Sequence, residues 1–480
     1  MDKRRDAILN GALAPNLVKF GLPLAIAMGL QACFNLIDLA IIGRLPNGSI
    51  AVAALVSCDL LAVIGTIFTQ GVSNAAVAII SRYFGRGDQS SLNHATWNSI
   101  TVVAVLSIIF GAFGYFGAPF LTGGMVGLEG ETQQIAESYL KIIVGHSWTI
   151  FFLLHLTAVM RALGDAKWPT IILIAANVLN IFLDVLFVYG PGDAPAAFAW
   201  GAPIAAALGI PRMGVDGAAW ATVIARAVGV LWAAVLLMRY KNGPRFVRSE
   251  MRPTRAELTR LIRIGAPSSA QFLVRISGVL VVLSLVARIY EPTNPAVATA
   301  LSVCIRLDML GLFLGLGWGS AAATFVGMNL GNQAPKRAEK AGWVAAVLNS
   351  GVMILVGLVF ILFSEQIFAL FLQDDSTEIA LSTVFSVGKQ YLWIVGSSYA
   401  FIGTALVLSN ALQGATDTMS SFLIDLIVIF GVQVPAMLVV TLVLDAPPNG
   451  LWACIAGANV LSAVAYALWY RKGRWKSLEV

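Results

Sequence analysis

Charged residues are scarce in this chain of 480 residues. Only 12% of its residues are charged while 58% are hydrophobic, against roughly 25% charged in an average soluble domain. A soluble globular fold is therefore excluded, because its surface would lack the charges that keep it in water. We expect a membrane protein.

Cysteine and histidine are also scarce, with four and three residues. The cysteines lie in apolar stretches, where a free cysteine packs like a small hydrophobe. His146 and His155 are nine residues apart, so a helix would place them on opposite faces. No nucleophile stands beside a base. We therefore expect no enzyme, no metal site and no cofactor.

Long apolar stretches fill most of the chain. Each is close to the ~20 residues that cross a bilayer as a helix. They predict an all-α membrane protein with twelve transmembrane helices, at residues 16–42, 51–81, 96–118, 133–160, 168–190, 216–239, 261–288, 295–327, 342–364, 386–412, 419–443 and 449–470.

Basic residues favour one side of these spans. Most of the 31 lysines and arginines lie in the loops on the side of the N-terminus, and the opposite loops hold only Arg44, Arg212 and Arg288. Because cytoplasmic loops collect basic residues, we expect a multi-pass protein of the inner (plasma) membrane with both termini in the cytoplasm. The net charge of +6 then needs no nucleic-acid partner. We read no signal peptide at the N-terminus.

Three pairs of segments repeat between the two halves. Phe20–Pro23 matches Ile264–Pro267, and two further pairs follow at similar offsets, Ser81–Gly85 with Gly327–Gly331 and Arg161–Asp165 with Gln413–Asp417. Six spans in each half make the repeats parallel. We predict two six-helix bundles related by a pseudo-two-fold axis: an N-terminal lobe at 1–239, a basic cytoplasmic linker at 240–260 and a C-terminal lobe at 261–480.

Several carboxylates fall inside the spans, where each costs about 3 kcal/mol. They are Asp38, Asp59, Asp184, Asp308 and Asp425. Helical spacing puts Gln31 and Asn35 on the same face as Asp38, and puts Asn177 and Asn180 on the same face as Asp184. Two stripes that each end in an aspartate would meet if the first and fifth spans were neighbours.

Such an acid pair suits ion coupling. Burial and a second carboxylate both favour a shared proton, and the same oxygens with amide groups could hold Na⁺ instead. The sequence does not choose between H⁺ and Na⁺. Pro23 lies in the first span and removes a backbone hydrogen bond, which predicts a hinge there.

At these residues the chain resembles the multidrug and toxic compound extrusion (MATE) family over essentially its whole length. The motifs are Asn35–Leu45, Arg161–Pro169, Asn180–Asp184 and Val326–Gly331. Arg306-Leu-Asp308 resembles the Arg-x-acid element of the prokaryotic DNA-damage-inducible (DinF-like) branch. The chain departs from the family at Ala162, where a glycine is usual, and in having Asp59 and Arg275.

The resemblance implies cation-coupled export of amphipathic, often cationic compounds by alternating access. It makes Asp38, Asn180 and Asp184 the ion-coupling residues. Further candidates around a substrate cavity are Gln31, Asn35, Tyr139, Thr157, Asn177, Arg275, Arg306 and Asp308. The expected partners are small amphipathic molecules and the lipid bilayer, with the protein acting as a monomer.

Two alternatives to an antiporter remain. A channel is disfavoured because no filter-like segment occurs. A flippase for lipid-linked saccharides would have a related bundle with a cationic cavity. Arg275 and Arg306 are compatible with such a cavity, so this alternative stays open. The second half has Val282, Val432 and Ala436 where the repeat places Asp38, Asn180 and Asp184, so we expect one coupling site and not two.

Overall fold

The computed structural model describes residues 3–45, 48–245, 247–371 and 381–478, and it places no strand among them. A few side chains inside helices, Asn35 among them, lie outside the described set. The principal helices are α1 (Lys3–Leu9), α2 (Leu13–Gly43), α3 (Gly48–Arg86), α4 (Gln89–Pro119), α5 (Gly130–Ile143), α6 (Trp148–Ala162), α7 (Lys167–Tyr189), α8 (Gly201–Leu208) and α9 (Gly214–Arg239).

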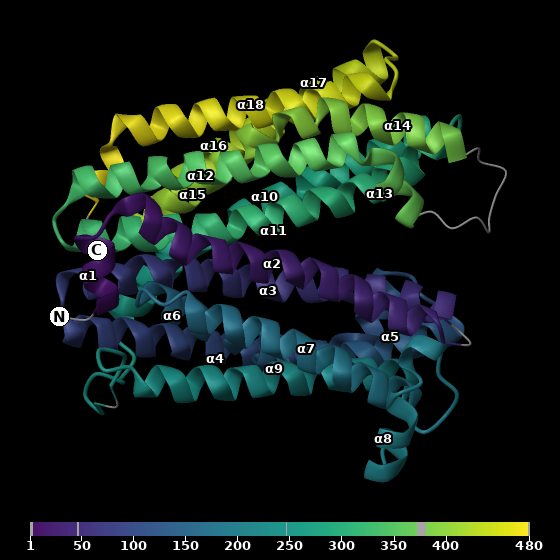
Figure 1. Ribbon diagram of the computed structural model, residues 1–480, viewed down its shortest axis with the longest axis horizontal. Helices are drawn as coiled ribbons and strands as arrows, with labels where there is room; N and C mark the ends of the chain where they lie inside the picture. The colour runs from purple at the N-terminus through teal and green to yellow at the C-terminus, as the bar shows by residue number, and fades with distance from the viewer. Residues whose placement is uncertain (1–2, 46–47, 246, 372–380, 479–480) are drawn as a thin grey trace. The chain divides into compact units, whose positions relative to one another are not determined.

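The second half repeats this succession of long helices (Figure 1). It contains α10 (Arg255–Leu285), α11 (Pro295–Gly331), α12 (Pro335–Leu362), α13 (Ser364–Phe371), α14 (Leu381–Ile394), α15 (Tyr399–Gly414), α16 (Thr418–Leu426), α17 (Val434–Leu438) and α18 (Pro448–Lys472). Between α16 and α17 the helix widens into the π-helical segment η5 (Ile427–Gln433).

Local sequence explains where two of the long helices begin. The Asp88 side chain accepts a hydrogen bond from the Ser91 amide at 3.1 Å and caps α4. Asn294 caps α11 by accepting from the Ala296 amide, and Pro295 occupies the first turn, where its missing N–H costs nothing. Both caps fall in short breaks between long apolar helices, as the predicted spans require.

Eleven helices among the described residues are long and apolar enough to cross a membrane, and the number rises to 12 if the bent pair α5 and α6 is one span. The predicted all-α fold with about twelve spans is thus confirmed. The fourth predicted span, 133–160, is two helices that meet at 43°. The short helix α8 lies outside the predicted spans, and α13 begins at the last residue of the predicted span 342–364.

The described chain divides into two compact units. Unit N contains residues 30–266, and unit C contains Lys3–Gly29 together with Pro267–Val480. This grouping differs from the predicted lobes, which assign the whole first span to the N-terminal half. Close packing is the reason: a Cβ on Gly317 would lie 2.3 Å from the Ala25 amide nitrogen, so the first part of α2 lies directly against α11.

Unit N is built on a pair of neighbouring helices and a group of three. α7 packs along α9, and α3 packs against α4 and α6 (Figure 1). A buried apolar cluster with members on α2, α3, α5, α7 and α9, including Ile41, Leu55, Leu140 and Val188, fills one end of the unit. These helices carry the predicted polar stripes, so the packing decides whether the stripes meet.

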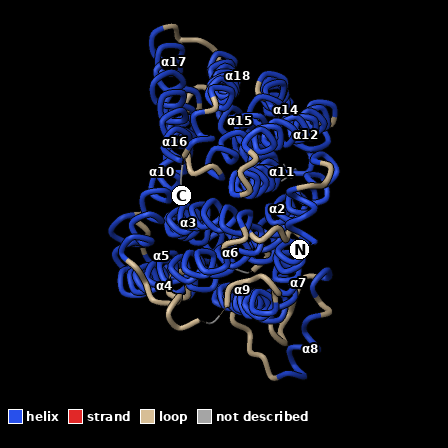
Figure 2. Tube along the Cα trace, turned by 90° about the vertical axis from the view of Figure 1, so that its left-hand side faces the viewer, coloured by secondary structure: helices blue, strands red, loops and turns tan. Residues whose placement is uncertain are grey.

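Unit C is arranged around α11. The helices α12, α14 and α15 lie against it, and α18 packs on α15 (Figure 2). The two ends of the chain meet at the start of α12: Arg337 donates to the carbonyl oxygens of Ile8 and Gly11, and the Lys476 ammonium lies 2.7 Å from the Glu339 carboxylate. Both ends therefore lie at one end of unit C, as an even number of spans requires.

Candidate functional site

The polar stripes of α2 and α7 meet in unit N. The Asn177 side-chain amide donates to the Gln31 side-chain oxygen at 2.8 Å. One turn further along α7, the Asn180 amide donates to Asp184 Oδ2 at 3.1 Å. Spacing along α7 is enough to explain why Asn177, Asn180 and Asp184 share a face of that helix. The contacts show that the first and fifth predicted spans are neighbours here.

Asp38 and Asp184 form the centre of this contact. Their carboxyl groups lie close enough to interact directly. An ionised carboxylate is an acceptor only, so a hydrogen bond between two carboxyl groups requires that one of them carries a proton. The Oδ1 atom of each is buried and has no hydrogen-bond partner among the described residues. The pair therefore holds two oxygens that could accept a further proton or a cation.

α9 adds a group that the sequence interpretation missed. The Arg226 charge acts on Asp38, Asp59 and Tyr139, and one turn earlier Thr222 Oγ1 accepts from the Asn180 amide at 3.2 Å. A signal was present, because Arg226 is an arginine in the middle of an apolar span. Unit N thus surrounds its acid pair with one cation, a third carboxylate and a tyrosine.

The other candidate residues of unit N differ in their surroundings. Tyr139 is buried within electrostatic reach of Asp38 and Asp59. The Thr157 hydroxyl donates to the Leu153 carbonyl at 2.8 Å, so it is occupied by its own helix. Pro23 lies within α2 and does not interrupt it. The Asn35 side chain lies outside the described residues.

Unit C contains a buried ion pair. One of its members, Arg275, stands where the repeat places the counterpart of Gln31. Arg275 Nε lies 2.6 Å from Asp425 Oδ2. The same carboxylate accepts from the Gln271 amide at 2.7 Å and from the Tyr466 hydroxyl at 2.8 Å. Gln271 also donates to Ser409, which ties α10, α15, α16 and α18 into one network. Arg275 is therefore neutralised by a neighbouring acid.

Asp308 on α11 finds its partners on other spans, as expected from its two-residue spacing from Arg306. The Tyr391 hydroxyl donates to Oδ2, and the Tyr399 hydroxyl donates to Oδ1 at 2.5 Å. These tyrosines come from α14 and α15, 83 and 91 residues away in the chain. Arg306 is exposed and does not line the cavity described next.

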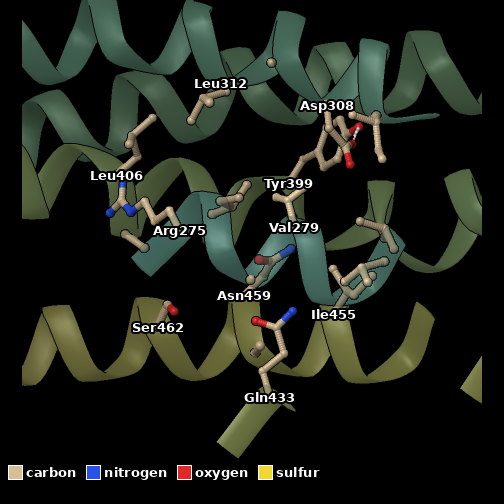
Figure 3. A pocket seen from close by; sticks show the side chains of 18 of the residues that line it. Arg275, Val279, Asp308, Leu312, Tyr399, Leu406, Gln433, Ile455, Asn459 and Ser462 are labelled. Atoms are coloured by element: carbon tan, nitrogen blue, oxygen red, sulfur yellow. Dashed lines mark hydrogen bonds between the residues drawn. The ribbon is translucent and has the colours of Figure 1, made fainter. Parts of the chain in front are cut away.

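A cavity of about 250 Å³ lies inside unit C. Figure 3 shows Arg275 and Asp308 at separate places on its wall, with Tyr399 beside Asp308. Aliphatic side chains form most of the lining, among them Val279, Leu312 and Ile455. Val282, the repeat counterpart of Asp38, is one of the lining residues. An apolar wall thus stands in unit C where unit N has its acid pair.

No group of three or more His, Cys, Asp or Glu side chains within reach of one metal ion occurs among the described residues. His155, fully buried in unit N, has hydroxyl groups on both sides: Ser73 at 3.2 Å from Nδ1 and Ser99 at 3.0 Å from Nε2. Its two ring nitrogens are therefore engaged in linking α3, α4 and α6.

A family model described as MatE matches residues 23–186 and again residues 267–439. Together the two matches span well over half of the chain. They begin at Pro23 and Pro267, the same pair of prolines that opens the repeat seen in the sequence. The duplication is therefore recovered independently of the segments on which we predicted it.

Curated proteins of similar sequence match over nearly full length. The probable multidrug resistance protein YpnP of Bacillus subtilis is 25% identical over 470 residues, which cover 98% of this chain and 97% of that protein. The probable multidrug resistance protein NorM of Thermotoga maritima is 24% identical over 471 residues, which cover 97% and 93%.

Solved structures share the fold. A crystal structure of MATE in the straight conformation has a TM-score of 0.84 at 20% identity and covers 98% of both chains. A MOP superfamily transporter of Pyrococcus furiosus, described as having a binding pocket of reverse polarity, has a TM-score of 0.85, at 21% identity and with 98% of both chains covered.

Proposed function

The chain belongs to the multidrug and toxic compound extrusion family of membrane transporters, and from this premise we propose that it exports amphipathic, often cationic compounds in exchange for H⁺ or Na⁺ by alternating access. Members of this family are transporters and not enzymes. Relatives named as probable multidrug resistance proteins over nearly the full chain length support the choice of substrate.

The contact between Asp38 and Asp184 carries the ion-coupling part of this proposal. Two buried carboxyl groups that share a proton form a site whose charge changes by one unit when that proton leaves. The nearby Arg226 charge limits the cost of the ionised state. The closeness of the two acids supports H⁺ as the coupling ion, because two carboxyl groups can hydrogen-bond only when one of them carries a proton.

Coupling follows from repulsion between the two acids. Once both carboxyl groups are ionised, they repel each other and can no longer hydrogen-bond. The helices α2 and α7 then lose the contact that joins them at this level. Binding of H⁺, or of Na⁺ with help from the Asn180 side chain, restores it. We propose that this change is transmitted along α2 to a hinge at Pro23 and so links ion binding to alternating access.

The charge balance of unit C weighs against the flippase alternative. A cavity for lipid-linked saccharides was expected to be cationic, but the charged residues lining the cavity of unit C are one arginine and two aspartates. Arg275 is paired with one of them. We further propose that the protein lies in the inner membrane with both termini in the cytoplasm, for which the basic loops are the support, and that it works as a monomer.

Export in everted vesicles tests this function. Wild type, Asp38→Asn and Asp184→Asn would be compared under an imposed proton gradient and, separately, a sodium gradient, with ethidium as the transported cation. We expect each substitution to reduce gradient-driven export at least tenfold under the coupling gradient. Asp193→Asn is the matched control, because Asp193 is an exposed acid that follows α7 in the same unit.

Three outcomes would count against the proposal. Export that is unchanged in both variants would remove the acid pair from coupling. Export that needs neither gradient would remove ion exchange altogether. Flipping of a lipid-linked saccharide, with no ethidium movement under either gradient, would replace the export function.

A further inference from the structure

The cavity of unit C contains a carboxylate that lacks a cationic partner. Arg275 and Asp425 form an ion pair at 2.6 Å, which cancels two of the three charges on the cavity lining. Asp308 is the third. Among the described residues, tyrosine hydroxyl groups and no cationic side chain hydrogen-bond to it or act on its charge. The lining therefore carries one uncompensated negative charge.

Hydrogen bonding at Asp308 suits an ionised carboxylate. Both of its oxygens accept from a tyrosine O–H, and accepting at both oxygens is what the ionised form does. A partly buried carboxylate with hydrogen bonds but no counter-ion still bears a desolvation cost. A ligand with a positive charge would offset that cost, whereas a negatively charged ligand would increase it.

The two tyrosines are held in place by aromatic neighbours. Tyr391 packs edge-to-face on Trp452, with ring centroids 4.9 Å apart, and Tyr399 packs edge-to-face on Phe360 at 6.1 Å. Such contacts restrict ring motion at modest energetic cost. A cation held at Asp308 would thus lie beside the hydroxyl ends of two tyrosines that are held in place.

The remaining cavity wall suits an apolar body. Val279 and Leu312 lie between Asp308 and Arg275 in Figure 3, and Ile455 lines another part of the wall. The volume of about 250 Å³ is below the roughly 300–1,000 Å³ of drug-sized pockets. The space therefore fits a small amphiphile, such as one aromatic ring with a charged head.

We propose that this cavity in unit C binds a small amphipathic monocation, whose ammonium group lies at Asp308 between Tyr391 and Tyr399 and whose apolar part lies along α10, α11 and α18. The inference rests on the proposed function and deepens it. It assigns substrate binding to unit C and leaves ion coupling to the acid pair of unit N.

Binding of benzyltrimethylammonium to the purified full-length chain in lipid nanodiscs tests the site. Isothermal titration would be compared with phenylmethanesulfonate, which has the same ring and the opposite charge. We expect one cation to bind per chain, at least tenfold more tightly than the anion. Equal affinities for the two, or no binding of the cation, would overturn the proposal.

Variants then locate the site. Asp308→Asn keeps hydrogen-bonding groups but removes the charge, and should weaken cation binding at least tenfold. Leu312→Trp fills the cavity, leaves Asp308 in place and should abolish binding. Glu365→Gln removes an acidic charge of the same unit whose side chain is 68% exposed, so it should bind like wild type. Unchanged binding in Asp308→Asn and Leu312→Trp would overturn the assignment.

A conservative variant guards against misfolding. Tyr399→Phe removes one hydroxyl and keeps the ring, so it should weaken binding a few-fold while the thermal melting curve stays that of wild type. If Asp308→Asn unfolds, Leu312→Trp and Tyr399→Phe test the site in its place. Wild-type affinity for benzyltrimethylammonium in both of these variants would reject the site.

Asp184→Asn separates this inference from the proposed function. We expect it to bind benzyltrimethylammonium like wild type and to lose gradient-driven export. Cation binding that is lost in Asp184→Asn and kept in Asp308→Asn would place the substrate in unit N and reject the inference while the coupling function stands. Export that survives in Asp184→Asn would reject the coupling function and would leave the proposed cation site in the cavity of unit C unaffected.

Discussion

At the scale of single residues, the two units handle buried charge differently. In unit N, Asp38 and Asp184 lie close together and each keeps a buried oxygen without a partner among the described residues. In unit C, Asp425 accepts from Arg275, Gln271 and Tyr466. An unsatisfied acid pair can exchange an ion, whereas a fully hydrogen-bonded ion pair holds helices together.

This difference predicts the effect of breaking the ion pair. Asp425→Asn leaves the Arg275 charge without its partner in the interior, which costs about 3–5 kcal/mol. We expect a large loss of stability, measured by thermal unfolding in detergent micelles. Glu365→Gln is the control, because its pair with Lys389 spans 3.4 Å between exposed side chains and is worth about 0–1 kcal/mol.

A double substitution sharpens that test. Replacing Arg275 with Met and Asp425 with Leu removes both charges and should recover most of the lost stability, since apolar replacements of buried pairs are often neutral. Similar melting temperatures for Asp425→Asn and Glu365→Gln would contradict a structural role of the pair.

Helix periodicity was sufficient to predict which polar residues of α7 share a face in unit N, and it was insufficient for the contacts of unit C. Asn177, Asn180 and Asp184 share a helical face by spacing alone, and their contact with α2 followed once those helices were neighbours. Nothing local links Asp308 to Tyr391 and Tyr399, because contacts between distant spans depend on how the helices pack. Arg226 was missed for a different reason: basic residues were used to find loops.

At the scale of elements, the linker between the repeats is attached to α4. The Gln89 amide donates to the Gly243 carbonyl at 3.0 Å, and the Trp97 indole donates to the Arg245 carbonyl at 3.0 Å. Glu250 accepts from Ser90 at 2.8 Å and from Asn93 at 2.5 Å. The basic segment predicted as a linker is thus held by side chains of unit N.

These hydrogen bonds predict a pH dependence. Donation by Asn93, then by Ser90, holds the pKa of Glu250 below its ordinary 4.5. A carboxylate whose folded pKa is lowered stabilises the fold above its unfolded pKa, and that contribution is lost as the pH falls through the folded value. Glu250→Gln should therefore lower the melting temperature at pH 7, and the difference from wild type should shrink below about pH 4.5.

The background variant Asn93→Ala supplies the control. It removes the principal donor, so adding Glu250→Gln to it should change the melting temperature less at pH 7 than in wild type. A Glu250→Gln effect that is the same at pH 7 and in the acid range, where the carboxylate is protonated, would contradict a role for the carboxylate charge.

At the scale of the whole molecule, α2 belongs to both units. Its residues up to Gly29 group with unit C and its residues from Leu30 group with unit N, so Pro23 and Asp38 lie in different units on one helix. The sequence alone predicted one lobe for this helix, because a repeat boundary says nothing about which neighbour each turn packs against. Gly21 shows the packing: a Cβ there would lie 2.7 Å from the Trp318 ring.

Pro23→Ala tests whether bending of α2 matters for transport. The alanine restores an amide that can donate to the carbonyl of Lys19, and proline inside a helix costs about 3 kcal/mol, so α2 becomes stiffer and the protein no less stable. We expect a several-fold slower initial export of ethidium from proteoliposomes under a proton gradient, with benzyltrimethylammonium affinity unchanged.

Pro295→Ala is the control, because that proline lies in the first turn of α11, where no hydrogen bond is regained. Equal export rates for wild type and Pro23→Ala would show that transport proceeds without a hinge at this proline, and coupling between Asp38 and export would then have to run through α7.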